Sequence, residues 1–147
     1  MFLNTLLVCL VAVVGPVKVV GVSDGDTLTV IENNVTTKIR LAGIDAPESG
    51  QAFGSRAKSE LSRLVFGQHV TYEPESTDQY GRVVAHVSVN GEWVNLWMVN
   101  SGMAWHYKRY SSSTELAAAE ILARRNRRGL WVDPNPIPPW DFRKGKL

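Results

Sequence analysis

The chain has 147 residues, of which 44% are hydrophobic and 20% are charged, and its net charge is +2. These values predict a single globular domain that is large enough to bury a hydrophobic core without the help of disulfide bonds or structural metal ions. The single cysteine, Cys9, excludes an intrachain disulfide and a thiolate zinc site, and the three histidines show no metal-ligand spacing, which leaves oxygen ligands for any metal (His69, His86, His106).

Residues 1–14 are almost wholly apolar and uncharged. The run is too short to span a bilayer and is typical of the hydrophobic region of a secretory signal. No Lys or Arg comes directly after Met1, however, and the junction at Gly15-Pro16 is a poor site for signal-peptide cleavage. We interpret residues 1–15 as a signal peptide for export to the periplasm or the extracellular space. The alternative is a cytoplasmic protein in which this run forms a buried first strand.

The next hundred residues contain strand and helix patterns in turn. β-branched, alternating runs predict five strands: Val17–Ser23, Thr27–Ile31, Val35–Leu41, Val70–Glu73 and Arg82–Val89. Apolar residues at helical spacing, with capping residues, predict three helices: Ala52–Phe66 before Gly67, Val94–Asn100 before Gly102, and Glu115–Arg128 between Ser113 or Thr114 and Gly129.

Five strands in a three-plus-two arrangement, with a helix between the third and the fourth, favour an α+β fold. The best match is a five-stranded oligonucleotide/oligosaccharide-binding (OB-fold) barrel with three α-helices. Another small α+β sheet fits the same pattern. We expect one domain over residues 16–132, and a Pro-rich tail over 133–147 that lies on the domain surface as an extended strap.

Six basic residues and only two acidic ones lie between Lys108 and Arg128. A polyanionic partner would be attracted to such a patch although the whole chain is nearly neutral. A solvated helix face explains the run equally well.

Asp24 and Asp26 flank Gly25 at the start of a predicted strand and can face the same side. Carboxylate oxygens without sulfur or imidazole suit Ca²⁺ or Mg²⁺. The alternative is a turn without further function.

Arg40 ends a predicted strand, and Asp45 and Glu48 lie on either side of Pro47. The arginine can bind an anionic group, Asp45 can share a cation with Asp26, and Glu48 can orient a water. A structural ion pair of Arg40 with Asp45 or Glu48 is the alternative.

Arg82 begins the fifth predicted strand, just after Gly81. A second arginine that converges on Arg40 would hold a phosphate from two sides and stabilise charge in a transition state. Three aromatic residues can stack on a base or sugar, or belong to the core or its rim (Tyr80, Trp105, Tyr107).

Over residues 17–131 the chain resembles the staphylococcal nuclease (micrococcal nuclease, thermonuclease) family in three ordered blocks: Asp24-Gly25-Asp26-Thr27, then Arg40 with Asp45-Ala46-Pro47-Glu48, then Asp78 to Arg82. The resemblance implies a five-stranded barrel with three helices, and hydrolysis of DNA and RNA with Ca²⁺ that leaves 3′-phosphate ends. We expect a monomer with no stable membrane partner.

The resemblance also implies roles for individual residues. Asp26, Asp45 and the backbone carbonyl of Ala46 would bind Ca²⁺, with Asp24 close to the metal. Glu48 would be the general base, and Arg40 with Arg82 would bind the phosphate. Tyr80, Trp105 and Tyr107 would surround the nucleotide.

The chain departs from the founding member of the family at three places. Ala46 replaces a threonine, Trp105 replaces a tyrosine, and the segment after Glu48 lacks a longer, lysine-bearing loop. The last difference bears on substrate affinity and base preference. The main rival hypothesis is a non-catalytic OB-fold module that binds nucleic acid. The chain keeps the five carboxylate and arginine residues that such a module would lack, which counts against this rival (Asp26, Arg40, Asp45, Glu48, Arg82). A third reading, a small barrel with no nucleic-acid role, fits the basic run poorly.

Overall fold

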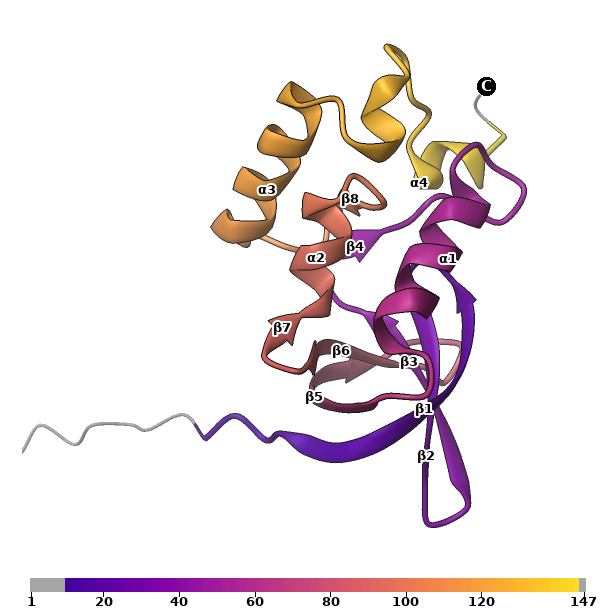
Figure 1. Ribbon diagram of the computed structural model, residues 1–147, viewed down its shortest axis with the longest axis vertical. Helices are drawn as coiled ribbons and strands as arrows, with labels where there is room; N and C mark the ends of the chain where they lie inside the picture. The colour runs from indigo at the N-terminus through magenta and orange to yellow at the C-terminus, as the bar shows by residue number, and fades with distance from the viewer. Residues whose placement is uncertain (1–9, 146–147) are drawn as a thin grey trace, which may run out of the picture.

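Five strands close into a barrel in the computed structural model, which describes residues 10–145 (Figure 1). The strands pair in the order β3-β2-β1-β5-β6, and parallel pairing of β3 with β6 closes the ring. The barrel strands are β1 (Val14–Asp24), β2 (Thr27–Glu32), β3 (Val35–Leu41), β5 (His69–Thr77) and β6 (Val83–Val89). The predicted OB-type α+β fold is therefore confirmed.

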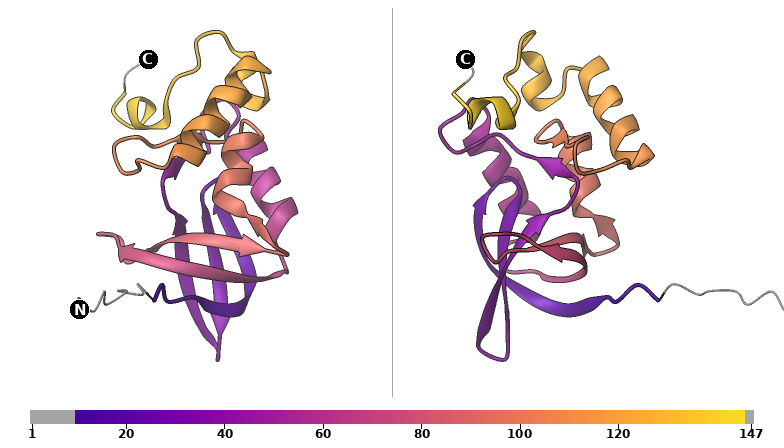
Figure 2. Two further views of the ribbon diagram at one scale, coloured as in Figure 1. Left: turned by 90° about the vertical axis from the view of Figure 1, so that its left-hand side faces the viewer. Right: turned by 180° about the vertical axis from the view of Figure 1, so that it is seen from behind.

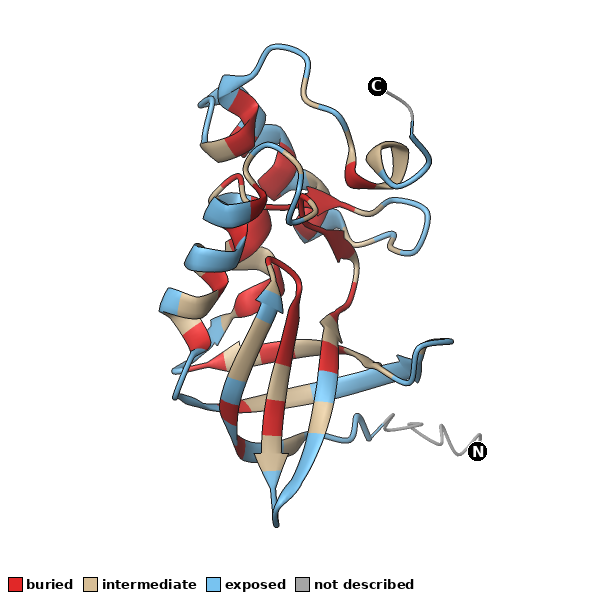
Figure 3. Ribbon diagram, turned by 90° about the vertical axis from the view of Figure 1, so that its right-hand side faces the viewer, coloured by how far each residue is buried: buried red, intermediate tan, exposed pale blue. Residues whose placement is uncertain are grey.

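Alternating apolar residues line the inside of this barrel. Leu28 and Val30 on β2, and Ile39 and Leu41 on β3, are all almost completely buried. The β2–β3 hairpin turns at Asn33-Asn34, where both residues have positive φ, as their ability to adopt the left-handed region predicts. Figure 3 shows the tip of this hairpin exposed, and buried residues concentrated where the barrel meets the helices.

The helices gather at one end of the barrel (Figure 2). They are α1 (Gly54–Val65), α2 (Val94–Asn100), α3 (Thr114–Arg125) and a one-turn α4 (Pro139–Phe142), with a 3₁₀ turn, η1, at Gly129–Val132. The side chain of Ser113 caps α3 by accepting a hydrogen bond from the Leu116 N–H. None of the helices in the described part of the chain is long and apolar enough to cross a membrane.

The prediction was wrong at the end of α3. The helix ends at Arg125, three residues before the predicted end, because Asn126 leaves the helical conformation and Arg127 adopts a φ of 51°. Gly129 therefore begins the 3₁₀ turn and does not cap the helix.

Two short strands form a second small sheet that the sequence did not predict. β4 (Ile44–Asp45) pairs with β8 (Trp105–His106), so that Asp45 lies opposite Trp105. A further short strand, β7 (Glu92–Trp93), forms a hairpin with β6. Strands of two residues show no periodicity, which explains why pattern reasoning missed them.

The Pro-rich tail is only partly the extended strap that we expected, because Pro139–Phe142 form α4. Figures 1 and 2 show this tail next to the loop that precedes α1. The expected signal peptide falls mostly on residues 1–9, which lie outside the described residues, and Val14 already belongs to β1, where it pairs with Tyr72.

Candidate active site

Close packing at Gly25 fixes the turn between β1 and β2. A Cβ atom at this position would lie 2.6 Å from Ala57 Cβ on α1 and 2.8 Å from Ala46 Cβ. Both distances are shorter than real Cβ contacts, so only glycine fits. The turn is therefore packed directly against α1 and against the segment that carries Asp45.

Asp26 is held in this turn by hydrogen bonds to both of its carboxylate oxygens. Oδ1 accepts a hydrogen bond from the Thr27 hydroxyl at 3.1 Å, and Oδ2 accepts one from the Ala46 N–H at 2.8 Å. The Asp26 N–H in turn donates to Asp24 Oδ1 at 3.0 Å. Asp26 is 5% exposed, so its position is set by these bonds and by burial.

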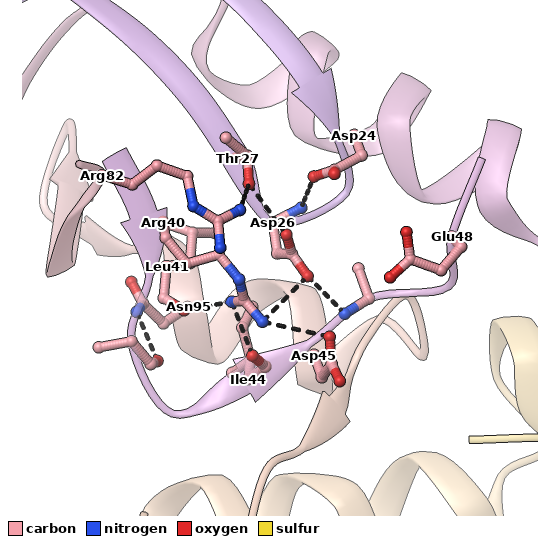
Figure 4. Close-up of polar contacts among 12 residues, drawn as sticks. Asp24, Asp26, Thr27, Arg40, Leu41, Ile44, Asp45, Glu48, Arg82 and Asn95 are labelled. Atoms are coloured by element: carbon pink, nitrogen blue, oxygen red, sulfur yellow. Dashed lines mark hydrogen bonds and ion pairs between the residues drawn. The ribbon is translucent and has the colours of Figure 1, made fainter. Parts of the chain in front are cut away.

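Arg40 joins Asp26 to Asp45. Its Nη2 lies 3.1 Å from Asp45 Oδ1 and 3.4 Å from Asp26 Oδ2, and its Nη1 donates to the carbonyl oxygens of Leu41 and Ile44. The ion pair with Asp45, which we had kept as an alternative, is therefore present. Two acids that are 19 positions apart in the sequence thus converge on one nitrogen atom (Figure 4).

Asn95 on α2 supports the turn that follows Arg40, and sequence reasoning missed it. Its buried amide donates to the carbonyl oxygens of Ala42 at 2.9 Å and Ala85 at 3.2 Å, and accepts a hydrogen bond from the Val87 N–H at 3.0 Å. A single polar residue inside an apolar helix was the one available signal, because a buried amide must find partners.

Arg82 points toward the same acids from the start of β6. Its Nε donates to Asp78 Oδ2 at 2.7 Å, and its Nη1 lies 3.5 Å from the Thr27 hydroxyl that binds Asp26. Tyr80 is 75% exposed, and the Arg82 guanidinium lies over its ring at 5.4 Å from the centroid. The structure thus brings Arg82 and Tyr80 to the rim of the acidic group.

Glu48 has an unexpected partner in the C-terminal tail. Arg143 Nη1 donates to Glu48 Oε1 at 2.7 Å, and the same guanidinium forms two hydrogen bonds to Asp45, at 3.1 and 2.7 Å. Nothing in the sequence pattern singled out Arg143, because it lies 95 positions from Glu48.

Burial and charge shift the pKa values of the grouped acids in different directions. Burial, reinforced by the negative charge of Asp26, raises the pKa of Asp24 to about 7. Burial also opposes ionisation of Asp26, but Arg40 and the hydrogen bonds that Asp26 accepts lower its pKa overall. Burial raises the pKa of Asp45, although Arg143 and Arg40 act in the opposite direction. At neutral pH Asp26 is therefore ionised, whereas Asp24 is close to the midpoint of its titration.

The chemistry of these residues suits a hard divalent cation. All the candidate ligands are oxygen atoms. Burial and the negative charge of Asp26 both disfavour the charged form of Asp24, and a bound cation would offset them. Within residues 10–145, however, no three side chains of the His, Cys, Asp or Glu type are grouped as a metal site. Asp45 is bonded instead to Arg40 and Arg143.

Two of the predicted stacking residues lie under the tail. Trp105 is 7% exposed and contacts Trp131 and Trp140 edge to face, while Tyr107 stacks on Trp140 with an angle of 3° between the ring planes. Trp105 is therefore a core residue, as the alternative reading had it. Beside them lies a pocket of about 380 Å³, lined by aromatic and mostly basic side chains.

The basic run is partly used for internal contacts. Glu120, which is buried, binds Arg124 at 3.0 Å and lies 3.5 Å from Lys108, while Arg128 donates to Asn100. Arg124 also covers the ring of Trp131 at 4.1 Å from its centroid. Fewer cations than the sequence implied are therefore free to meet a polyanion.

Comparison with known proteins finds relatives that are named as nucleases. Residues 38–133 match the profile of staphylococcal nuclease homologues. The chain is 44% identical to a micrococcal nuclease of Shigella flexneri over 138 residues, which cover 86% of this chain and 79% of that protein. It is also 44% identical to an uncharacterized endonuclease of Haemophilus influenzae, over 86% of this chain and 72% of the relative. A staphylococcal-like nuclease of Arabidopsis thaliana is 43% identical over 74% of this chain and 34% of its own length.

Proposed function

The chain belongs to the staphylococcal nuclease family and is an endonuclease of that type, and from this premise we propose that it cleaves both DNA and RNA with Ca²⁺ and leaves 3′-phosphate ends. One observation carries the proposal. Asp26 and Asp45 lie 3.4 and 3.1 Å from the same Arg40 nitrogen, with Glu48 and Arg82 beside them. Carboxylates that can bind a metal, a carboxylate that can take a proton from water and arginines that can bind a phosphate therefore lie in one place.

The metal ligands in this proposal are Asp26, Asp45 and the backbone carbonyl of Ala46, with Asp24 nearby. When bound, Ca²⁺ neutralises phosphate charge and lowers the pKa of a water. Asp26 is suited to this role because its pKa is lowered, so it is ionised at neutral pH. The N–H of Ala46 already binds Asp26, which keeps the two segments at a fixed separation.

The remaining roles follow from charge and exposure. Glu48, whose side chain is 33% exposed, is placed to accept or orient the proton of an attacking water. Arg82, whose side chain is 27% exposed, is free to bind a non-bridging phosphate oxygen with its Nη groups. Arg40 is 14% exposed and makes four contacts within the protein, so it stabilises the acids as well as any phosphate. Tyr80 is the aromatic residue best exposed for stacking on a base.

We also propose that the protein acts as a monomer outside the cytoplasm. Mass spectrometry of the mature N-terminus tests export, and an intact Met1 on a cytoplasmic protein would contradict it.

The first experiment is cleavage of plasmid DNA and of RNA with Ca²⁺ and then with excess EGTA. We expect cleavage of both substrates that stops when the chelator removes Ca²⁺. The ends should prime a polymerase only after phosphatase treatment, because a 3′-phosphate blocks extension. Lack of cleavage with Ca²⁺ at any pH from neutral to alkaline would contradict the proposed reaction.

A matched pair of variants locates the site in the same assay. Arg82→Ala removes a cation placed at the transition state and should lower the rate by about 10³-fold. Arg63→Ala removes an exposed arginine that pairs with Glu60 on α1, and should change the rate by less than about twofold. A near-normal rate in Arg82→Ala would mean that the phosphate binds elsewhere.

A further inference from the structure

The C-terminal tail places a third guanidinium among the acids of the site. Arg143 forms a two-bond fork with the Asp45 carboxylate and a third hydrogen bond with Glu48. Bidentate arginine–carboxylate pairs are stronger and more directional than single ion pairs. One side chain thus ties the candidate metal ligand to the candidate base.

The tail that carries Arg143 is anchored on both sides of the site. The Trp140 ring stacks on Tyr107 at 5.1 Å and meets Trp105 edge to face at 5.4 Å. Gln51 accepts a hydrogen bond from the Glu48 N–H and donates one to the Ile137 carbonyl oxygen. The short loop after Glu48 is therefore bonded to the tail, and both segments hold Arg143 opposite Glu48.

Glu48 depends on this contact for its orientation. Among residues 10–145, Arg143 is the hydrogen-bond partner that the structure shows for the Glu48 carboxylate. Without it, a partly exposed glutamate would sample several rotamers. An error of about 1 Å in the position of a reacting group can lower a rate by about 10²-fold.

We propose that Arg143 is a positioning residue of the nuclease reaction, which holds Glu48 and Asp45 in their working orientation from the C-terminal tail. The inference rests on the proposed function and adds a segment outside the barrel to the site. Acids that bind metals are commonly held by such outer hydrogen bonds.

The arginine contacts of Asp45 leave about one of its acceptor positions unused. An ionised carboxylate has roughly four acceptor positions, and the structure shows three hydrogen bonds from arginines to Asp45. Arg40 and Arg143 offset part of the negative charge of the acids of the site and so reduce repulsion of a phosphate.

The test is a double-mutant cycle between Arg143→Ala and Glu48→Gln, with kcat and KM measured on one oligonucleotide at saturating Ca²⁺. We expect Arg143→Ala to lower kcat by about 10²-fold with KM changed less than about threefold. In the Glu48→Gln background the same change should lower kcat by less than about tenfold, because the residue that it positions has already lost its function. Arg143→Lys, which keeps the charge, should recover about tenfold over alanine.

Controls separate positioning from stability. Thermal unfolding should show that Arg143→Ala is still folded at the assay temperature although it has lost its bonds to Asp45, and Arg143→Gln replaces it in the cycle if it is not. Arg63→Ala, the surface arginine on α1, should match the unaltered protein. An unchanged or increased kcat in Arg143→Ala, a lysine variant no better than alanine, or additive effects in the cycle would overturn the inference. Lack of cleavage by the unaltered protein would instead overturn the proposed function, and this inference with it.

Discussion

Three aspartates lie close together at the end of the barrel, but their surroundings shift their pKa values in different directions (Asp24, Asp26, Asp45). Asp26 is stabilised as an anion by Arg40 and by two hydrogen-bond donors. Arg40 also acts on Asp24, but burial and the negative charge of Asp26 outweigh it and raise the pKa of Asp24 to about 7. At the residue scale, the site therefore stores electrostatic repulsion at one identified carboxylate.

Replacing Asp24 should release this repulsion in a pH-dependent way. The folded pKa of about 7 lies above the ordinary value of 3.8, so stability falls as the pH rises between these two values. Asp24→Asn keeps an oxygen acceptor for the Asp26 N–H and removes the charge. We expect it to increase the free energy of unfolding by about 1–2 kcal/mol at about pH 8, after allowance for partial exposure, and by close to zero at about pH 4.

Urea unfolding in EGTA at the two pH values measures this difference. Asp133→Asn is a matched control, because Asp133 accepts a hydrogen bond from the N–H two residues ahead, as Asp24 does, but is exposed. An equal loss of stability at both pH values in Asp24→Asn would show that the hydrogen bond, and not the charge, matters there.

Single residues were predictable where the chemistry lies in a local pattern. The clustering of Asp26, Arg40 and Asp45 was expected from their spacing and from the family resemblance, and the structure places them together. Arg143 and Asn95 were not predictable. Glu48 and Asp45 lie at least 95 positions from Arg143, and Ala42 lies 53 positions from Asn95, so these contacts arise only when the tail and α2 dock.

At the scale of elements, α2 acts as the support of the site. Its Asn95 reaches both β6 and the Ala42 carbonyl oxygen in the turn between β3 and β4, which follows Arg40. Its other inward residues, Val94, Met98 and Val99, pack into the core. One amide therefore links an apolar helix to the turn that places Asp45.

Asn95→Ala should lower the free energy of unfolding by about 3 kcal/mol. The change removes the Asn95 partner of the buried Val87 N–H and of the Ala42 carbonyl oxygen and opens a small cavity, while the Ala85 carbonyl oxygen keeps its hydrogen bond from the Ala42 N–H. Chemical denaturation measures the loss. Asn135→Ala, at an exposed position in the tail, should stay within about 0.5 kcal/mol of the unaltered protein. A loss below about 1 kcal/mol in Asn95→Ala would show that α2 is held by apolar packing alone.

Most elements were predictable because their periodicity is local. All five barrel strands and α1 to α3 form where they were predicted, although β5 ends four residues later and α3 three residues earlier than expected. β4, β8 and α4 have at most four residues each, and their formation depends on tertiary contacts: β4 pairs with β8, and α4 carries the Trp140 ring onto Tyr107. Such contacts leave no signal in hydrophobic spacing.

At the scale of the whole molecule, fewer of the basic side chains are free of internal partners than the sequence indicates. Internal partners bind Arg124, Arg128 and, at 3.5 Å, Lys108. Arg109 is exposed and lies over the ring of Tyr110, which is itself 67% exposed, and Lys144 is exposed on the tail. Both cations line the pocket beside Arg143, so a polynucleotide that reaches the acids would meet few free cations on its way.

This distribution predicts a shallow salt dependence of nucleic-acid binding. We expect a single-stranded oligonucleotide in EGTA to contact about three cations, namely Arg82, Arg109 and Lys144. The logarithm of its affinity should therefore fall with the logarithm of salt concentration with a slope of about −2, at about 0.7 per contact.

Fluorescence anisotropy between about 50 and 200 mM salt measures the slope. Arg109→Ala should make it shallower by about 0.7, while Arg63→Ala should leave it unchanged, because Arg63 lies on α1 and pairs with Glu60. A slope that is the same in all three proteins would place the binding surface away from this pocket, and a much steeper slope would mean that the internally bonded arginines are released when the strand binds.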